Sequence, residues 1–273
     1  STIWTYEYVM SRILSEGKTD GDDLIQGFYR QDTLDGGMGD DTLNGGELSD
    51  TYIFDIGYGN DTIVETDWSL SGATDKVSFG AGISLADINV SRDGNNLILT
   101  VDGTGDSLKI IEQHIRYSNG ATPDQIEEFH FADGTIVDAE YWRAVDLQSH
   151  MTSGDDLVVG FTFDDTLAGG AGNDRLEGGG GSDVYLFNLG DGTDTIREST
   201  ITGVGINNSD DTVQFGAGLT VADLSLSRSG NDLVFNFAGG ETLVIESQLG
   251  HEWLHTVEYF ELSDGTVWSA AQV

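Results

Sequence analysis

The chain has 273 residues, long enough for two ordinary domains, and 48 acidic against 11 basic residues give it a formal net charge of −37. Such an acid excess repels phosphate, which excludes nucleic acid as a partner and argues against an anionic membrane surface. Hydrophobic residues make up 38% of the chain, too many for a disordered acidic tail, yet no apolar run approaches the roughly 20 residues of a membrane span, and cysteine is absent, so no disulfide framework holds the fold.

Residues 1–17 are predicted to contain the end of a preceding unit and a linking helix. The segment STIWTYEYV at 1–9 resembles GTVWSAAQV at 265–273, so the chain starts at the phase of a repeating unit at which it also stops. We therefore expect a fragment of a larger tandem protein, holding about two full units. Residues 5–15 mix apolar and polar side chains and predict a short helix.

Residues 18–66 are predicted to form a coil of short strands. Nonapeptides such as KTDGDDLIQ (18–26) and GGMGDDTLN (36–44) repeat in register, with a two-residue slip before IGYGNDTIV (56–64). An apolar residue follows two positions after each repeated aspartate and is expected to point into the core. Glycine accepts positive φ and so allows the six-residue turn between strands. The aspartates of this block are Asp23, Asp32, Asp41, Asp50 and Asp61.

Residues 67–137 change to a two-residue alternation, which predicts half-buried antiparallel strands. Leu97, Leu99 and Val101 fall on one face, and Gly94 falls where a hairpin turn belongs. Residues 138–150 then predict a second linking helix, at 138–149.

Residues 151–199 repeat the nonapeptide block, and residues 200–273 repeat the strand-rich segment. The second block has the same spacing of aspartates and the same slip. Its strand-rich segment matches the first, since ADLSLSRSGNDLVFNF (222–237) resembles ADINVSRDGNNLILTV (86–101), with Gly230 at the turn. The aspartates of this block are Asp156, Asp165, Asp174, Asp183 and Asp194.

The nonapeptides resemble the RTX, or haemolysin-type calcium-binding, repeat family, and the strand-rich segments resemble the related domain that often follows such repeats. The resemblance implies an all-β fold of two right-handed parallel β-rolls alternating with small antiparallel segments. It also implies calcium between turns, type I secretion and folding outside the cell. Family members include toxins, adhesins and extracellular enzymes, so the repeats do not choose among these activities.

The expected calcium ligands are carboxylate and carbonyl oxygens, the donors that calcium prefers. Successive nonapeptides lie on opposite sides of a coil, so each ion would lie between alternate turns, and we expect about four to six ions. The glycine-rich side of each roll supplies the candidate residues Asp23, Asp41, Asp61, Asp156, Asp174, Asp194, Gly21, Gly37, Gly39, Gly59, Gly154, Gly170, Gly172 and Gly192.

The other side of each roll is degraded, because bulky residues replace glycines in the second repeat and Leu48 replaces one in the fourth. The sequence therefore does not decide whether calcium also binds at Asp32/Asp50 and at Asp165/Asp183. The alternative is that the aromatic residues Phe28, Tyr29, Phe161 and Phe163 cover this side of the coil.

One motif points toward an enzyme, because His251-Glu252-Trp253-Leu254-His255 matches the zinc-protease pattern HExxH. It lies between two apparent strands and has no third ligand at a familiar spacing, so a variable loop is the simpler interpretation. The isolated His114, His130 and His150 are expected to be surface or strand residues rather than catalysts.

The sequence thus predicts a non-catalytic, calcium-binding structural module of a large secreted bacterial protein, extracellular or at the cell surface. Its expected partners are calcium ions and the neighbouring repeat units of the parent, an adhesin or toxin. The alternative is an accessory module of an extracellular enzyme that binds polysaccharide.

Overall fold

In a computed structural model the described residues are all but 1–4, 66–72, 118–121, 123–124, 199–209 and 251–255. The chain divides into two compact units, Ser1–Ile115 with Ala121–Arg143, and Arg116–Gly120 with Ala144–Val273. Two α-helices are present in the described part of the chain, α1 (Tyr6–Gly17) and α2 (Ala139–Ser149), where the sequence predicts short helices. Neither of these described helices is long and apolar enough to cross a membrane.

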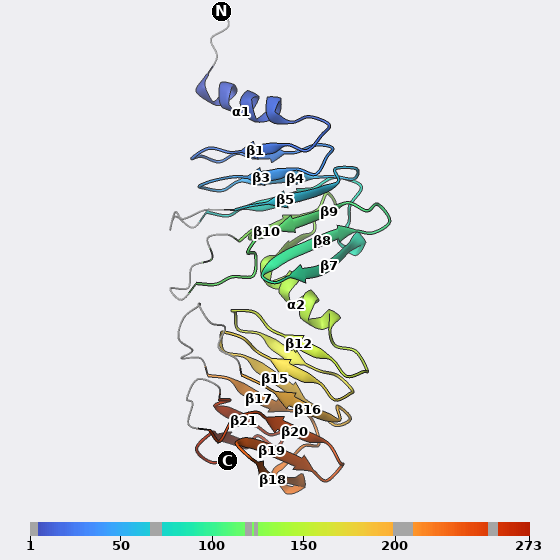
Figure 1. Cartoon of the computed structure of the whole chain (residues 1–273), viewed down its shortest axis with the longest axis vertical. Helices are drawn as coiled ribbons and strands as arrows, with labels where there is room; N and C mark the ends of the chain where they lie inside the picture. The colour runs from blue at the N-terminus through green and yellow to red at the C-terminus, as the bar shows by residue number, and fades with distance from the viewer. Residues whose placement is uncertain (1–4, 66–72, 118–121, 123–124, 199–209, 251–255) are drawn as a thin grey trace, which may run out of the picture. The chain divides into compact units, whose positions relative to one another are not determined.

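The first unit is a stack of short strands joined by tight turns (Figure 1). Its repeat strands are β1 (Leu24–Gln26), β2 (Thr33–Asp35), β3 (Thr42–Asn44), β4 (Thr51–Phe54), β5 (Asn60–Ile63) and β6 (Lys76–Phe79). They are followed by a 3-10 turn (Leu85–Asp87), β7 (Ile88–Asp93), β8 (Asn96–Val101), β9 (Ser107–Ile110), β10 (Glu128–His130) and β11 (Ile136–Asp138).

The second unit repeats this order. Its repeat strands are β12 (Leu157–Val159), β13 (Thr166–Ala168), β14 (Arg175–Glu177), β15 (Val184–Phe187), β16 (Thr193–Ile196) and β17 (Thr212–Phe215). A 3-10 turn (Val221–Asp223), β18 (Leu224–Ser229), β19 (Asp232–Phe237), β20 (Thr242–Ile245), β21 (Tyr259–Glu261) and β22 (Val267–Ser269) complete it.

Alternate repeat strands belong to the same sheet and are parallel, because each nonapeptide makes half a coil. In the first unit β1 pairs with β3 and β3 with β5, while β2 pairs with β4 and β4 with β6. In the second unit β12, β14 and β16 follow one another in one sheet, and β13, β15 and β17 in the other. The predicted parallel β-roll is thus present in both units.

The antiparallel strands complete the sheets of each roll rather than forming a separate layer. The strand β8 pairs antiparallel with both β7 and β9, and β9 pairs in parallel with β5. Likewise β10 joins β6 in parallel, and β11 closes that sheet. The resulting sheet orders are β1-β3-β5-β9-β8-β7 and β11-β10-β6-β4-β2, and the second unit has the same two orders with its own strands.

The core of each unit lies between its two sheets, and the apolar residue two positions after each repeat aspartate is buried in it, as predicted. These residues are Ile25, Leu34, Leu43, Tyr52 and Ile63 in the first unit, and Val158, Leu167, Leu176, Tyr185 and Ile196 in the second, all buried. The hairpin residues Leu97, Leu99 and Val101 share the first core, and Leu233, Phe235 and Phe237 the second. The all-β class predicted from the sequence is confirmed.

Candidate metal centres

The turns on the glycine-rich side of each roll stack so closely that a side chain would not fit. Gly39 and Gly59 take φ of +126° and +94°, in the left-handed region that glycine favours. A Cβ on Gly59 would lie 2.4 Å from the carbonyl oxygen of Gly39 in the coil before it. Of the candidate glycines, Gly37, Gly39, Gly59, Gly170, Gly172 and Gly192 share positive φ, whereas Gly21 and Gly154, in the first turn of each block, do not.

The aspartates of these turns form a ladder in which each carboxylate is held by the coil before it. The backbone N–H of Asp23 donates to Asp41 Oδ1 at 2.8 Å, and that of Asp41 donates to Asp61 Oδ1 at 3.0 Å. In the second unit the Asp156 N–H donates to Asp174 Oδ1 at 2.8 Å, and the Asp174 N–H to Asp194 Oδ1 at 3.0 Å. One oxygen of each of these carboxylates is therefore fixed in place.

The other oxygen of each of these carboxylates is buried and unsatisfied. Within the described residues, Oδ2 of Asp41, Asp61, Asp174 and Asp194 has no hydrogen-bond donor. A buried charged oxygen without a partner is costly, so such atoms indicate a binding site for a cation. The glycines are what leave room for them, since a Cβ on Gly36 would lie 2.1 Å from Asp41 Oδ2. Carboxylate and carbonyl oxygens at a glycine turn suit a hard cation such as Ca²⁺.

The electrostatics of the ladder favour the same cation. Burial, reinforced by the neighbouring carboxylates Asp41, Asp40 and Asp106, raises the pKa of Asp61 to about 7. Burial also raises the pKa of Asp194 to about 7, with Asp174 and Asp191 adding to the effect. These shifts mean that the folded turns hold negative charge poorly unless a positive charge joins them.

The first aspartate of each ladder closes its own turn instead. The carboxylate of Asp23 accepts the backbone N–H of Thr19 at 2.6 Å, and that of Asp156 accepts the N–H of Thr152 at 2.7 Å. Both aspartates are half-buried, whereas Asp41 and Asp174 are buried. The better-enclosed carboxylates thus lie from the second coil onward.

Family models match both kinds of segment. The RTX calcium-binding nonapeptide repeat matches residues 19–52, 152–185 and 159–196, and the haemolysin-type calcium binding protein related domain matches 96–141 and 232–272. The chain is an RTX protein. Residues of the chain are 29% identical over 111 residues to the iron-regulated protein FrpA of Neisseria meningitidis serogroup C, spanning 41% of this chain but only 10% of FrpA. The extracellular lipase LipA from Serratia marcescens matches 94% of the chain over 38% of its own length, at 21% identity and a TM-score of 0.27.

The second RTX repeat of each block is degraded, and the structure shows what replaces its glycines. In the first unit, Arg30 Nε lies 2.8 Å from Asp32 Oδ1, so a guanidinium neutralises this aspartate from within its own turn. Phe161 is buried, and Phe28 and Phe163 pack against the cores, as the aromatic alternative predicts. Tyr29, the fourth aromatic residue of this alternative, does not cover the coil, since it is 85% exposed.

On the same side of each RTX roll, the ladder aspartates Asp50 and Asp183 meet carboxylates that the sequence did not single out. Asp50 groups with Glu65 and Asp75, and Asp183 groups with Glu198 and Asp211. A signal was available, since Asp75-Lys76-Val77 and Asp211-Thr212-Val213 keep the aspartate-x-apolar pattern. Asp75 and Asp211 lie 25 and 28 residues after the preceding ladder aspartate, whereas the regular spacing is 18. They therefore do not fit the nonapeptide pattern.

Two of the isolated histidines, His114 and His130, lie among described residues with defined surroundings. His114 is fully buried, contrary to the expectation of a surface or strand residue, and burial together with Arg143 and Arg92 lowers its pKa to about 3. His130 lies in β10, with Nε2 at 2.6 Å from Glu128 Oε2. The HExxH motif at 251–255 lies outside the described residues.

Proposed function

We propose that the chain is a calcium-triggered structural module of a secreted RTX protein of the adhesin or toxin type, and that it is not itself catalytic. Its role is to fold and stiffen outside the cell, where calcium is abundant. The observation that carries this proposal is the ladder of buried carboxylates, each with one oxygen fixed by a neighbouring coil and the other unsatisfied among the described residues. The chain spans about a tenth of FrpA, so the parent's own activity is a separate question.

The proposed ligands are Asp41 with Asp23 and Asp61 in the first roll, and Asp174 with Asp156 and Asp194 in the second. Bound calcium would supply the positive charge that these turns lack. The aspartates and the glycine carbonyls hold the ion, and the backbone bonds between coils orient each carboxylate before the ion arrives. The glycines keep the coils close enough for one ion to contact two turns.

The calcium affinity that is typical of extracellular modules would suit an extracellular trigger. Extracellular calcium modules bind at about 10⁻⁴ to 10⁻³ M, so millimolar calcium outside a cell fills them and submicromolar calcium inside does not. At a free calcium concentration about ten times the dissociation constant of a site, binding to that site stabilises the fold by about 1.4 kcal/mol through mass action. Several such sites amount to a large share of the roughly 5–15 kcal/mol stability of an ordinary domain.

The test is a calcium titration followed by far-ultraviolet circular dichroism. We expect the β signal to be lost in chelator and restored by calcium, and Asp41→Asn with Asp174→Asn to raise the calcium midpoint. Asp102→Asn is the matched control, since Asp102 is exposed and outside both ladders. A chain that is fully folded in chelator at low salt, or a midpoint that the double variant leaves unchanged, contradicts the proposal.

A further inference from the structure

Each unit contains a buried group of three carboxylates at the point where the roll passes into its antiparallel strands. We call these the closing clusters: Asp50, Glu65 and Asp75 in the first unit, and Asp183, Glu198 and Asp211 in the second. In each cluster the three residues offer one oxygen apiece, and these oxygens lie within 4.8 Å of one another. All six side chains are buried, with Asp183 1% and Glu198 4% exposed.

The glutamate of each cluster replaces a turn glycine. In the second unit β14 and β16 pair so that Glu198, which follows β16, takes the position that Gly178 holds one coil earlier. A Cβ on Gly178 would lie 2.2 Å from Asp183 Oδ2, so the tight turn admits no side chain there. One coil later, the consecutive ladder aspartates Asp183 and Asp211 are 28 residues apart, whereas Asp165 and Asp183 are 18 apart. Glu198 lies between Asp183 and Asp211 in the sequence.

Protein groups hold one oxygen of each carboxylate in the second cluster. The Asp165 N–H donates to Asp183 Oδ1 at 2.9 Å, and the Asp183 N–H donates to Asp211 Oδ1 at 2.8 Å. The Tyr185 hydroxyl donates to Glu198 Oε1. Tyr185 stands where other repeats carry an aliphatic residue, and it reaches from the core to the cluster. These bonds orient the carboxylates toward one another.

Two oxygens inside the second cluster are left over. Asp183 Oδ2 and Glu198 Oε2 are buried and have no hydrogen-bond donor in the described part of the chain. Three carboxylates that converge in a buried space repel one another unless a cation joins them. Unsatisfied buried oxygens indicate a bound cation, and they distinguish this cluster from an acidic patch on the surface, whose oxygens are hydrated.

The first unit builds the same arrangement from residues of the same types at equivalent positions. The Asp50 N–H donates to Asp75 Oδ1 at 2.6 Å, the Tyr52 hydroxyl donates to Glu65, and the Gly45 N–H donates to that hydroxyl at 2.7 Å. Both units therefore keep the aspartate pair, the glutamate in the glycine position and the tyrosine. The cluster is therefore a repeated element of the fold, present in both units.

We propose that each closing cluster is a calcium site of its own, in which three side-chain carboxylates bind the ion and the tyrosine hydroxyl positions the glutamate. It goes beyond the glycine-turn sites, because its ligands are side chains and the glutamate replaces the glycine. Oxygen-only donors select a hard cation, and calcium tolerates irregular geometry better than magnesium does. The ion would link Asp75 or Asp211, which directly precede β6 and β17, to the coil before them.

Counting bound ions tests the proposal. The full chain is dialysed against calcium and its ions are measured by elemental analysis, for the wild type and for Glu65→Gln with Glu198→Gln. We expect the variant to hold two ions fewer. Glu16→Gln with Glu177→Gln removes the same charge at more exposed positions and is expected to retain every ion. An unchanged ion count in the cluster variant overturns the proposal.

Two further measurements cover the case in which the cluster variant fails to fold. Tyr52→Phe with Tyr185→Phe leaves every carboxylate in place, and loss of a group that orients a ligand weakens metal affinity about 10–100-fold, so two of the ions should bind that much more weakly. Crystals of the wild type with a lanthanide should show anomalous peaks at both clusters. Peaks at the glycine turns alone overturn this inference and leave the proposed function standing, whereas peaks at neither place refute both.

Discussion

At the scale of single residues, the clearest difference between the two units is at the fourth repeat, where Leu48 replaces the glycine found at Gly181. Leu48 takes φ of +73°, in the left-handed region, and is 37% exposed. A β-carbon in this region costs of order 1–3 kcal/mol, and little burial offsets that cost here. Gly181 takes φ of +111°, and a Cβ there would lie 2.2 Å from the carbonyl oxygen of Phe163.

The two positions therefore give a matched pair of substitutions. We expect Leu48→Gly to raise the free energy of unfolding in calcium by about 1 kcal/mol, since relief of strain exceeds the extra chain entropy of glycine. Gly181→Leu should lower it by more than that, because it adds a clash with backbone to the same strain. Urea unfolding in millimolar calcium measures both. A Leu48→Gly variant that is less stable than the wild type would show that Leu48 makes a contact that outweighs its backbone strain.

The sequence predicted residue positions well wherever a ligand or core residue recurs at a fixed spacing. Ile25 and Leu176 are buried as the nonapeptide pattern predicts, and Asp41 lies on the same ladder as Asp61. The sequence pattern did not indicate Glu65 and Glu198, because Asp75 and Asp211 do not follow the preceding aspartate at the regular spacing of the repeats. Only the folded coil brings them together, and no periodicity reports such a contact.

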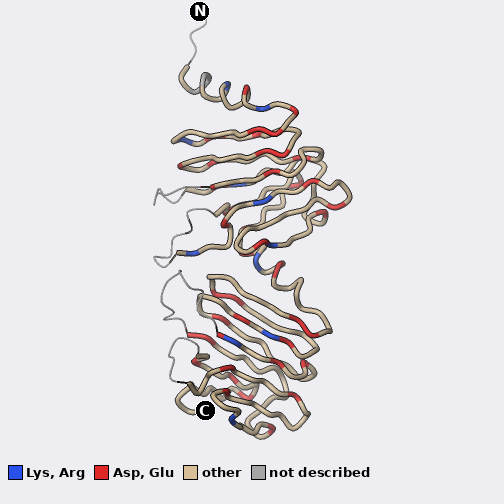
Figure 2. Tube along the Cα trace, in the orientation of Figure 1, with Lys and Arg blue, Asp and Glu red and all other residues tan. Residues whose placement is uncertain are grey.

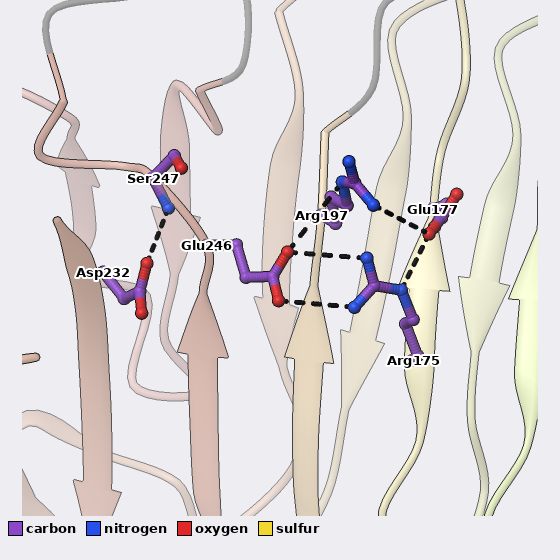
Figure 3. Close-up of polar contacts among 6 residues, drawn as sticks. All are labelled: Arg175, Glu177, Arg197, Asp232, Glu246 and Ser247. Atoms are coloured by element: carbon purple, nitrogen blue, oxygen red, sulfur yellow. Dashed lines mark hydrogen bonds and ion pairs between the residues drawn. The ribbon is translucent and has the colours of Figure 1, made fainter. Parts of the chain in front are cut away.

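At the scale of elements, the strands that follow the repeats stabilise the roll because they belong to its sheets; we call these strands, β7–β11 and β18–β22, the closing strands. In the second unit an ion-pair network joins three neighbouring strands of one sheet on its outer face (Figure 3). Arg175 of β14 lies 2.7 Å from Glu177 and 3.3 Å from Glu246, which follows β20, while Arg197 after β16 reaches the same two carboxylates at 4.0 and 3.9 Å. These side chains are partly exposed, so the network adds little energy, but it marks β20 as a neighbour of the repeats.

The coupling of the roll to its closing strands predicts a stability effect at Leu243. This residue of β20 is fully buried and lies in register with Asp194 of the calcium ladder. Leu243→Ala should cost about 2–5 kcal/mol and also raise the calcium midpoint of the second unit, because it loosens the strand beside the ladder. Leu226→Ala, on β18 of the same sheet but 40% exposed, is the control and should change both quantities little. Loss of stability with an unaltered calcium midpoint would mean that the two parts are independent.

The sequence anticipated the elements more fully than their pairing. Alternation predicted the strands β8 and β19, and Gly94 and Gly230 do occupy hairpin turns at φ of +61° and +65°. The parallel pairing of β9 with β5 and of β20 with β16 was not predicted, because the register of strands whose paired residues are 47 or more positions apart depends on which faces share a core. Local pattern specifies a strand but not its neighbour.

At the scale of the whole molecule, the dominant quantity is charge. Asp and Glu recur from coil to coil along each unit, and Lys and Arg are few (Figure 2). Both units enclose carboxylates at equivalent positions, so part of the negative charge is buried instead of lying on the surface. A positive partner must enter each unit, and either calcium or protons can fill that role.

Protons should therefore substitute for calcium in part, which gives a pH dependence of opposite sign in the two states. Burial raises the pKa of Asp61 and Asp194 to about 7, whereas an unfolded aspartate titrates near 4. Without calcium the folded chain then binds more protons than the unfolded chain between about pH 7 and pH 4, so its stability rises as the pH falls through this window. His114, whose pKa is lowered to about 3, opposes this trend but is a single group. With calcium present, protons compete for the same oxygens, and acid should weaken calcium binding.

Circular dichroism from about pH 8 to pH 5, in chelator and in millimolar calcium, measures both pH dependences. Asp61→Asn with Asp194→Asn should flatten the chelator arm near pH 7, because a neutral amide has no proton to gain. A chelated chain that loses β structure on acidification would show that its carboxylates are already satisfied without a cation.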